Sequence, residues 1–296
     1  MSKPYIVAGA KFDPTSGGQR VLAHLVHNLN LMGQRAYMQP GYDLNTGYDL
    51  GGLNIPVMET EKFRYWIEKG APVVYSDVIP GNPWNAKRVI RWVLAPPGTQ
   101  RNEYGQHWTP GDVEGERVYV FHKAKMPELD APELYLPAVE HQWFHARDLP
   151  AKQGGCLYHQ AHKWRDKIPN GAKLLPKIHR FRFGLAHHRQ ELAEYLRGRE
   201  YMLCLDYDTF IMSEAGLCGC YAILPENSMF SRKQYEASRL GLVGVAFGLG
   251  DELEVERARL EVEPDSNGEN AVSRRYAEAE QISREQLARF VEDTAE

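Results

Sequence analysis

The first forty residues alternate between short apolar runs and an amphipathic segment. Residues 4–10 and 35–39 are apolar runs, and each predicts a short strand. Between them the apolar positions recur every three or four residues, as in a helix that packs on a sheet. Ser16 and Gln19 have capping-box spacing at its start, and Gly33 follows its end. A strand, a helix and a second strand predict a parallel sheet.

The alternation continues through the first half of the chain. We expect a strand at residues 72–78 and a helix at 81–98, where Asn82 precedes Pro83 and Pro-Pro-Gly closes the segment. Further strands are expected at residues 117–122 and 133–137. The polar loops 41–60 and 98–116 are long, and loops of this length in a compact domain often have a function.

A second alternation begins after a polar linker at residues 144–154. Its expected elements are strands at 155–160, 201–207, 219–224 and 241–248, with helices at 187–198 and around 210–217. The repeated order of strand and helix predicts an α/β protein. We place one domain at residues 1–150 and a second at 151–250.

The last segment, residues 251–296, is an acidic tail with helical periodicity. Ser283 and Gln286 have capping-box spacing, which predicts a helix start. Leu287, Phe290 and Val291 form one apolar stripe, so we expect the tail to dock on the body of the protein.

The composition is that of a globular protein long enough for two cores. The chain has 296 residues, of which 43% are hydrophobic and 25% charged. It contains no apolar run of membrane-spanning length, and its N-terminus lacks a signal-peptide pattern, so a cytoplasmic location is expected. The four cysteines lack zinc-site spacing, and we expect buried, reduced thiols.

Positive charge is concentrated in the middle of the chain. Residues 151–250 carry 14 Lys and Arg against 9 Asp and Glu, a net charge of +5, whereas residues 1–150 have a net charge of −1. Such a cluster favours a phosphorylated ligand, although a solvated face is the alternative. One acid, Asp166, accompanies these cations: Lys163, Arg165, Lys167, Lys173, Lys177, Arg180, Arg182 and Arg189.

Two segments have residues suited to binding a polar ligand at a helix start. Gly17 and Gly18 leave backbone N–H groups approachable at the first helix, although an ordinary tight turn has the same composition. In "DYDTFIMSEAGLCGCYAIL", residues 206–224, Asp208 or Thr209 would cap a short helix.

The same segment carries a carboxylate that fits a vicinal diol. Thr209 and Ser213 offer hydroxyls, and Glu214 could accept two hydrogen bonds from a ribose. Alternatively, Glu214 pairs with a nearby arginine. The flanking apolar strands place this helix start at the carboxyl edge of a sheet, where open α/β sheets bind ligands.

Three segments together resemble GT-B glycosyltransferases, above all a bacterial and phage group with a "YPE…GNP…RW" segment and a "D…T…EA…CGC" segment. They are "SGGQRVLAHLVHNLNLMG" (16–33), "VVYSDVIPGNPWNAKRVIRWVLAPPG" (73–98) and the segment 206–224. The resemblance covers roughly residues 4–38, 72–98 and 155–248. It implies two Rossmann-like domains facing across a cleft, with the nucleotide-sugar donor held by the C-terminal domain and the acceptor by the N-terminal one.

The resemblance also implies roles for single residues. Glu214 would hold the ribose of the donor, and Thr209 and Ser213 would lie near its diphosphate. Gly17 and Gly18 would reach the diphosphate or the sugar. The cations facing the diphosphate would be Lys163 and Arg165, although "YHQAHKW" lacks the small residues of the family pattern. The paired-glutamate spacing of many retaining members is absent too, which leaves the stereochemical outcome open.

Glycosyl transfer to a hydroxyl with inversion needs a general base. Asp77, at a strand end, and Asp13, in the glycine loop, are the candidates, and a structural role is the alternative for both. Asp206-Tyr207-Asp208 lies in the ribose and diphosphate segment, so we interpret it as a capping sequence. We therefore expect no essential metal and no cofactor beyond the sugar nucleotide, for instance a UDP-sugar.

Aromatic side chains in the loop 98–116 are candidates for acceptor binding. His107 and Trp108 could stack on a sugar or a base, or pack within the loop. The acceptor would be a glycan or a hydroxylated base in phage DNA, and the net charge of residues 1–150 disfavours DNA. A hexosyl- or pentosyltransferase is the leading hypothesis. The alternatives are a sugar-nucleotide isomerase and a non-catalytic protein that binds nucleotide sugars or nucleic acid.

Overall fold

The computed structural model divides the chain into two compact units. Unit 1 consists of Met1–Ala138 and Glu280–Glu296, and unit 2 of Val139–Ala279. The structure describes residues 2–9, 11–44, 52–99, 105–158, 179–180, 188–205, 209–225, 230–248 and 250–295.

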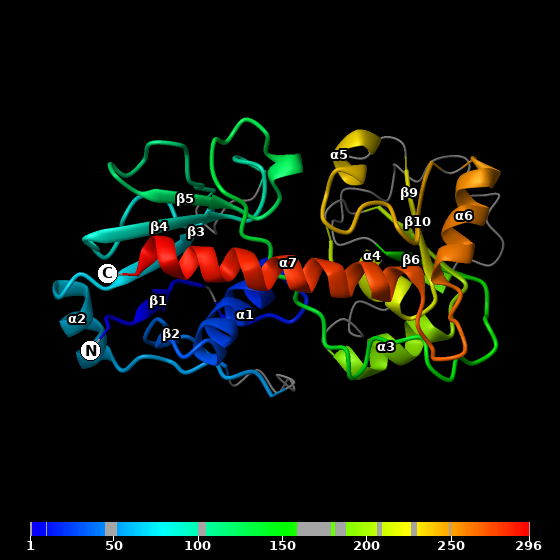
Figure 1. Cartoon of the computed structure of the whole chain (residues 1–296), viewed down its shortest axis with the longest axis horizontal. Helices are drawn as coiled ribbons and strands as arrows, with labels where there is room; N and C mark the ends of the chain where they lie inside the picture. The colour runs from blue at the N-terminus through cyan, green and yellow to red at the C-terminus, as the bar shows by residue number, and fades with distance from the viewer. Residues whose placement is uncertain are drawn as a thin grey trace. The chain divides into compact units, whose positions relative to one another are not determined.

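Unit 1 contains a five-stranded sheet in which every neighbouring pair is parallel (Figure 1). The strands lie in the order β2-β1-β3-β4-β5. Their bounds are β1 (Tyr5–Val7), β2 (Ala36–Met38), β3 (Pro72–Ser76), β4 (Arg88–Val93) and β5 (Arg117–Val120).

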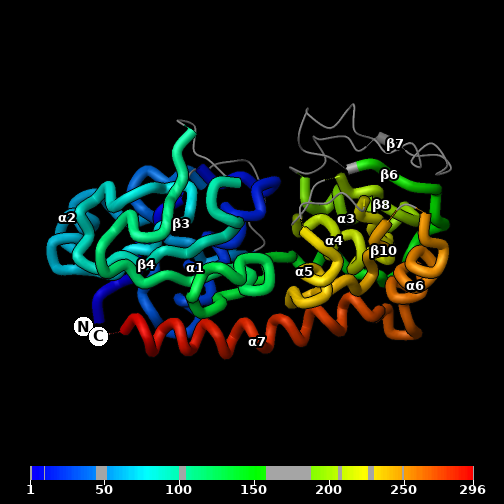
Figure 2. The backbone as a smooth tube through the Cα atoms, turned by 90° about the horizontal axis from the view of Figure 1, so that it is seen from above, coloured from blue at the N-terminus to red at the C-terminus, as the bar shows by residue number. Residues whose placement is uncertain are grey.

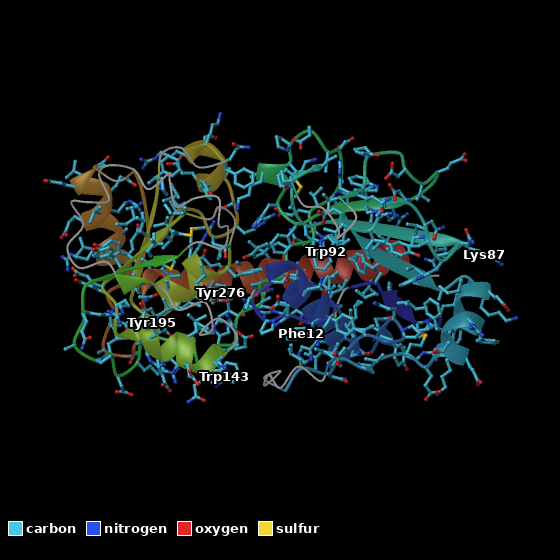
Figure 3. The ribbon with its side chains drawn as sticks, turned by 180° about the vertical axis from the view of Figure 1, so that it is seen from behind. Phe12, Lys87, Trp92, Trp143, Tyr195 and Tyr276 are labelled. Carbon is cyan, nitrogen blue, oxygen red and sulfur yellow. The ribbon has the colours of Figure 1, made fainter. Side chains whose placement is uncertain are left out.

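Two helices connect the first three strands of unit 1. The first is α1 (Gly17–Leu31), whose N-cap Ser16 accepts a hydrogen bond from the Gln19 amide, as the spacing predicted. The second is α2 (Thr60–Glu68), and a single 3₁₀ turn, η1 (Lys123–Lys125), follows β5. In the core of the unit, Trp92 is fully buried and its indole N–H donates to the Leu134 carbonyl (Figure 3).

Unit 2 repeats the same strand order. Its sheet runs β7-β6-β8-β9-β10, again parallel throughout. If the strands of each sheet are numbered as they occur in the chain, their order across the sheet is 2-1-3-4-5 in both units. The bounds are β6 (Gly155–Tyr158), β7 (His179–Arg180), β8 (Tyr201–Cys204), β9 (Tyr221–Leu224) and β10 (Val245–Phe247).

Among the described residues of unit 2, four helices accompany the sheet. They are α3 (Arg189–Arg197), α4 (Ile211–Leu217), α5 (Arg232–Glu236) and α6 (Glu252–Val262). Helix α3 contacts α4, which packs on β8 and β9, while α6 packs on β9 and β10. All four cysteines are buried free thiols, as expected, and lie in the core of this unit.

The last helix, α7 (Ala271–Thr294), contributes residues to both units. In unit 1 the ring of Phe290 lies between those of Tyr5 and Tyr119, at centroid distances of 5.8 and 4.9 Å. The hydroxyls of Tyr5 and Thr294 are hydrogen-bonded at 2.8 Å, so the two ends of the chain lie side by side (Figure 2). The predicted docking of the tail stripe is thus confirmed for Phe290, and Leu287 is buried as well.

The helix expected at residues 81–98 is wrong, because this segment forms strand β4. All of Val89–Val93 is buried, and the strand pairs with β3 on one side and β5 on the other. Neither face of the strand is therefore exposed to solvent. A fully buried strand has no polar face, and its apolar residues then match helical spacing by chance. Asn82 does not cap a helix but closes a turn by bonding both the amide and the carbonyl of Ala86.

Three smaller expectations also differ from the structure. Residues 133–137 form only an isolated bridge at Glu133, not a strand. Ser283 and Gln286 lie inside α7 rather than at a helix start. The units do not divide at residues 150 and 250, because Phe144 belongs to the core of unit 2 and so do Ala258 and Val262 of α6.

Replacing Phe290 with alanine should destabilise unit 1 by about 3–5 kcal/mol, because the variant loses the aromatic contacts and leaves a cavity. Urea unfolding measures this loss. Glu285→Ala, at an exposed position of the same helix, is the matched control. A loss below about 1 kcal/mol for Phe290→Ala would show that the tail is not part of the core.

Candidate functional site

In each sheet, the strand that comes first in the chain lies between the second and the third, so the direction in which strands are added reverses there. In unit 1 the chain goes from β1 outward to β2 and then returns to β3 on the other side of β1; in unit 2 it does the same around β6. Loops leaving the two central strands then diverge at their carboxyl ends, and open α/β sheets bind ligands there. Each unit therefore has one candidate edge.

Asp77 lies at the candidate edge of unit 1, directly after β3. Its side chain is 4% exposed, and its Oδ1 accepts a hydrogen bond of 2.9 Å from the Leu94 amide at the end of β4. Burial raises the pKa of Asp77 to about 6, and the Leu94 amide and the charges of Arg91 and His107 keep it from rising further. A carboxylate with a pKa near neutrality suits a general base.

The start of α1 lies close to the same point. A Cβ added to Gly18 would lie 3.5 Å from Cδ1 of Leu94, so the first turn of α1 lies against the residue that follows β4. Asp13 forms a tight turn here, because its Oδ1 accepts from the amide of Thr15 at 2.8 Å and from its hydroxyl at 2.7 Å. The structural alternative for Asp13 thus has direct support.

Gly9, just beyond β1, forms two hydrogen bonds with the side chain of Gln39, the residue after β2. The Gln39 side chain accepts from the Gly9 amide at 2.8 Å and donates to the Gly9 carbonyl. Gln39 was not among the expected site residues, although its place at the end of a predicted strand could have indicated it.

Of the two loop aromatics proposed for acceptor binding, Trp108 is packed. Its side chain is 1% exposed, and its indole N–H donates to Glu116 at 2.6 Å. Arg91, also paired with Glu116 at 3.2 Å, lies 5.9 Å from the ring. This geometry favours the packed alternative for Trp108. His107 lies beside Gly98, where an added Cβ would be 3.5 Å from its Nε2.

Glu214 lies at the candidate edge of unit 2, in α4 just after β8. Its carboxylate is 1% exposed and is bound by both terminal nitrogens of Arg189, at 2.5 and 3.3 Å. The same guanidinium binds Glu140 at 2.9 Å and stacks on Phe144 at 4.5 Å. The arginine partner that the sequence left as an alternative is thus present, whereas Glu140 was missed because it is distant in sequence.

In this buried group one cation faces two carboxylates. Burial lowers the pKa of Arg189, but the charges of Glu214 and Glu140 outweigh burial and raise it, so the guanidinium stays charged. The two-point contact with Arg189 also fixes the orientation of the Glu214 carboxylate.

The remaining predicted donor residues are only partly described. The Ser213 hydroxyl donates to the Phe210 carbonyl at 2.8 Å. Thr209 is half-buried and does not cap α4, whose N-cap is Phe210 without a side-chain bond. Lys163, Arg165 and Asp206–Asp208 lie outside the described residues. Within the described ranges, no cluster of three or more His, Cys, Asp or Glu side chains has metal-binding geometry.

No family model and no curated protein matches the sequence. Solved structures match it over nearly the whole chain. AviGT4, a glycosyltransferase involved in avilamycin A biosynthesis, has a TM-score of 0.55 and 15% identity over 99% of both chains. An α-glucosyltransferase in complex with UDP and a 13-mer DNA containing an HMU base has a TM-score of 0.52 and 11% identity over 97% of this chain and 95% of its own.

A sucrose-phosphate synthase from Thermosynechococcus elongatus matches with a TM-score of 0.50 and 12% identity, over 97% of this chain and 94% of its own. At such identities the likeness establishes the fold. The chain has the α/β fold of the GT-B glycosyltransferases, with parallel sheets and a C-terminal helix. Among the described helices, none has the length and apolar character needed to cross a membrane.

Asp77→Asn should stabilise the protein at neutral pH, because it removes a buried negative charge. The raised pKa of Asp77 means that the native state binds more protons than the unfolded chain between pH 4 and pH 6. Stability contributed by Asp77 therefore falls as pH rises through this window. Above pH 6 the buried charge costs about 3 kcal/mol. The variant should gain stability at pH 7.5 and lose most of that gain near pH 4, measured by urea unfolding at both values.

Asp130→Asn, which removes a charge from an exposed position of the same unit, is the control. If Asp77→Asn were less stable than the parent protein at pH 7.5, Asp77 would be a structural residue whose charge the fold requires.

Proposed function

We propose that this protein is a glycosyltransferase that moves a sugar from a nucleoside-diphosphate donor to an acceptor hydroxyl. The observation that carries the proposal is the match in fold to glycosyltransferases over at least 97% of the chain. The buried polar groups at the carboxyl edges of both sheets support it, because these edges are where the fold binds ligands. The UDP in one matched structure favours a uridine nucleotide.

Unit 2 is the proposed donor-binding unit. Glu214 would accept hydrogen bonds from the two ribose hydroxyls, with its carboxylate oriented by Arg189. Thr209 and Ser213 would lie near the diphosphate, and Lys163 and Arg165 would neutralise its charge. Gly17 and Gly18, at the start of α1 in unit 1, would offer backbone N–H groups to the diphosphate or the sugar. Cations and N–H groups stabilise the departing nucleoside diphosphate.

Unit 1 is the proposed acceptor unit, with Asp77 as the general base of an inverting reaction. Asp77 would take the proton of the acceptor hydroxyl while that oxygen forms a bond to the anomeric carbon. The bond from this carbon to the diphosphate oxygen breaks, and the nucleoside diphosphate leaves with the bonding electrons. His107 would lie beside the acceptor. The proposal needs no metal, and the four free thiols favour a reducing compartment such as the cytoplasm.

A panel of nucleotide sugars, screened by thermal shift and then by release of nucleoside diphosphate, tests the proposal. We expect one donor to raise the melting temperature and to be hydrolysed slowly without acceptor. Binding without turnover would identify a non-catalytic protein, and an altered sugar nucleotide would identify an isomerase. If no nucleotide sugar bound, the proposed function would be wrong.

Glu214→Gln should raise the donor Kd about tenfold or more, since it removes the charged acceptor of the ribose hydroxyls. Calorimetry with the donor found in the panel measures this change. Glu191→Gln, an exposed position on α3, should bind like the parent protein. Unchanged affinity in a folded Glu214→Gln variant would remove Glu214 from the donor site.

Asp77→Asn should bind the donor normally but lose at least about a hundredfold in transfer rate, as expected when a general base is removed. In the parent protein the rate should rise with pH through about 6, where Asp77 ionises, and then level off. A rate–pH profile without this rise, together with an active Asp77→Asn enzyme, would assign the base to another residue.

A further inference from the structure

Three buried side-chain oxygens in unit 1 have no hydrogen-bond partner among the described residues. They are Gln19 Oε1, Tyr42 Oη and Ser76 Oγ. The side chains of Tyr42 and Ser76 are 5% and 2% exposed. Leaving a buried polar group unpaired costs about 1–3 kcal/mol, so native proteins contain few of them, and each calls for a missing partner.

The three residues belong to the same edge of the sheet. Tyr42 follows β2, Ser76 ends β3, and Gln19 lies in the first turn of α1. Gly9 marks the point where they meet: a Cβ there would lie 3.1 Å from Gln19 Oε1 and 3.2 Å from the Tyr42 ring. The parallel register pairs Val7 with Val74, and its continuation places Ser76 beside Gly9. This is the switch point of the sheet.

The chemistry of the group is polar but uncharged. A hydroxyl, a phenol and a carboxamide both donate and accept hydrogen bonds, which is the pattern that recognises hydroxyl groups. Two cations from the adjoining segments already have partners: Lys11 forms an ion pair with Asp43 at 3.1 Å, and Arg20 donates a hydrogen bond to the Ala138 carbonyl. Asp77 adds negative charge at the same edge. The three uncharged side chains supply no positive charge to a phosphate placed among their oxygens, and Asp77 would repel it.

We propose that Gln19, Tyr42 and Ser76 form an acceptor subsite for an uncharged, hydroxyl-rich molecule, that is, a glycoside rather than a phosphorylated polymer such as DNA. The inference rests on the proposed glycosyltransferase function and specifies its acceptor. The oxygens are covered in this structure, so the ligand enters by displacing a side chain. Met38, whose terminal methyl would lie 3.0 Å from a Cβ on Gly9, has the flexible thioether suited to that movement.

The absence of internal hydrogen bonds separates binding from stability in a mutational test. Tyr42→Phe and Ser76→Ala remove oxygens that bond to nothing described in the free protein, so both variants should keep or slightly raise the melting temperature. Donor hydrolysis should stay within twofold of the parent rate. KM for the acceptor should rise on the order of tenfold in each variant. Tyr65→Phe, at an exposed position of α2, is the matched control.

The probes are a set of methyl glycosides, glucose 6-phosphate, and duplex DNA containing a hydroxymethylated pyrimidine. Binding is measured by saturation-transfer NMR without donor, and transfer by mass spectrometry with donor. We expect methyl glycosides to bind and to be glycosylated, and the two phosphate-bearing probes to be rejected. Weaker glycoside binding in both variants, with Tyr65→Phe unchanged, would support the subsite.

Three results would overturn it. The first is glycoside binding unaffected by both variants, which would leave the oxygens to a structural water. The second is modification of DNA alone, and the third is failure of every methyl glycoside to bind while donor hydrolysis persists. Failure of the proposed function is distinguishable, because donor hydrolysis would then be absent while the NMR measurement, which needs no donor, still reports on the subsite.

Discussion

The parallel pairing of all strands in each sheet is the constraint on which the rest of the structure depends. Parallel strands deliver every strand-to-helix loop to one edge, and the reversal of strand order opens that edge beside the first strand. In unit 1 this brings Asp77 and the start of α1 together. In unit 2 it brings Glu214 to the carboxyl edge next to Arg189. The polar groups come from segments distant in sequence, and the topology alone makes them neighbours.

The buried charges show what this arrangement costs. Asp77 and the Arg189 group are held away from water, which lowers stability unless hydrogen bonds and opposite charges compensate. Arg189 is compensated by two carboxylates, whereas Asp77 has the Leu94 amide and the more distant charges of Arg91 and His107. A buried carboxylate with a raised pKa at this edge suits the general base that we propose for Asp77.

Much of the fold could be predicted from the sequence, because periodicity and capping are local signals. The helix capped by Ser16 and the strands around it follow from them. Strand β4 could not be predicted in this way, since a strand buried on both faces has no alternation and its residues also match helical spacing. The division of α7 between two units was hidden as well, because it depends on packing that no local pattern records.

For the candidate site, the sequence indicated that Asp77 and Glu214 follow strands, but not which residues they contact. The position of Glu214 after a strand indicated a ligand edge, yet Glu140 lies 74 positions away in sequence and gave no signal. For Trp108 the sequence left two alternatives open, stacking on an acceptor or packing within the loop, and its contacts with Glu116 and Arg91 favour packing. The choice depends on tertiary contacts, which the composition of a loop does not record.

Hydrogen exchange of the protein with and without a saturating nucleoside diphosphate tests the central claim, that unit 2 binds the donor where β8 leads into α4. UDP, TDP, GDP, ADP and CDP are the ligands to compare. The account predicts that one of them slows exchange in peptides covering residues 205–217. Protection confined to other segments, or no protection by any of the five, would contradict it.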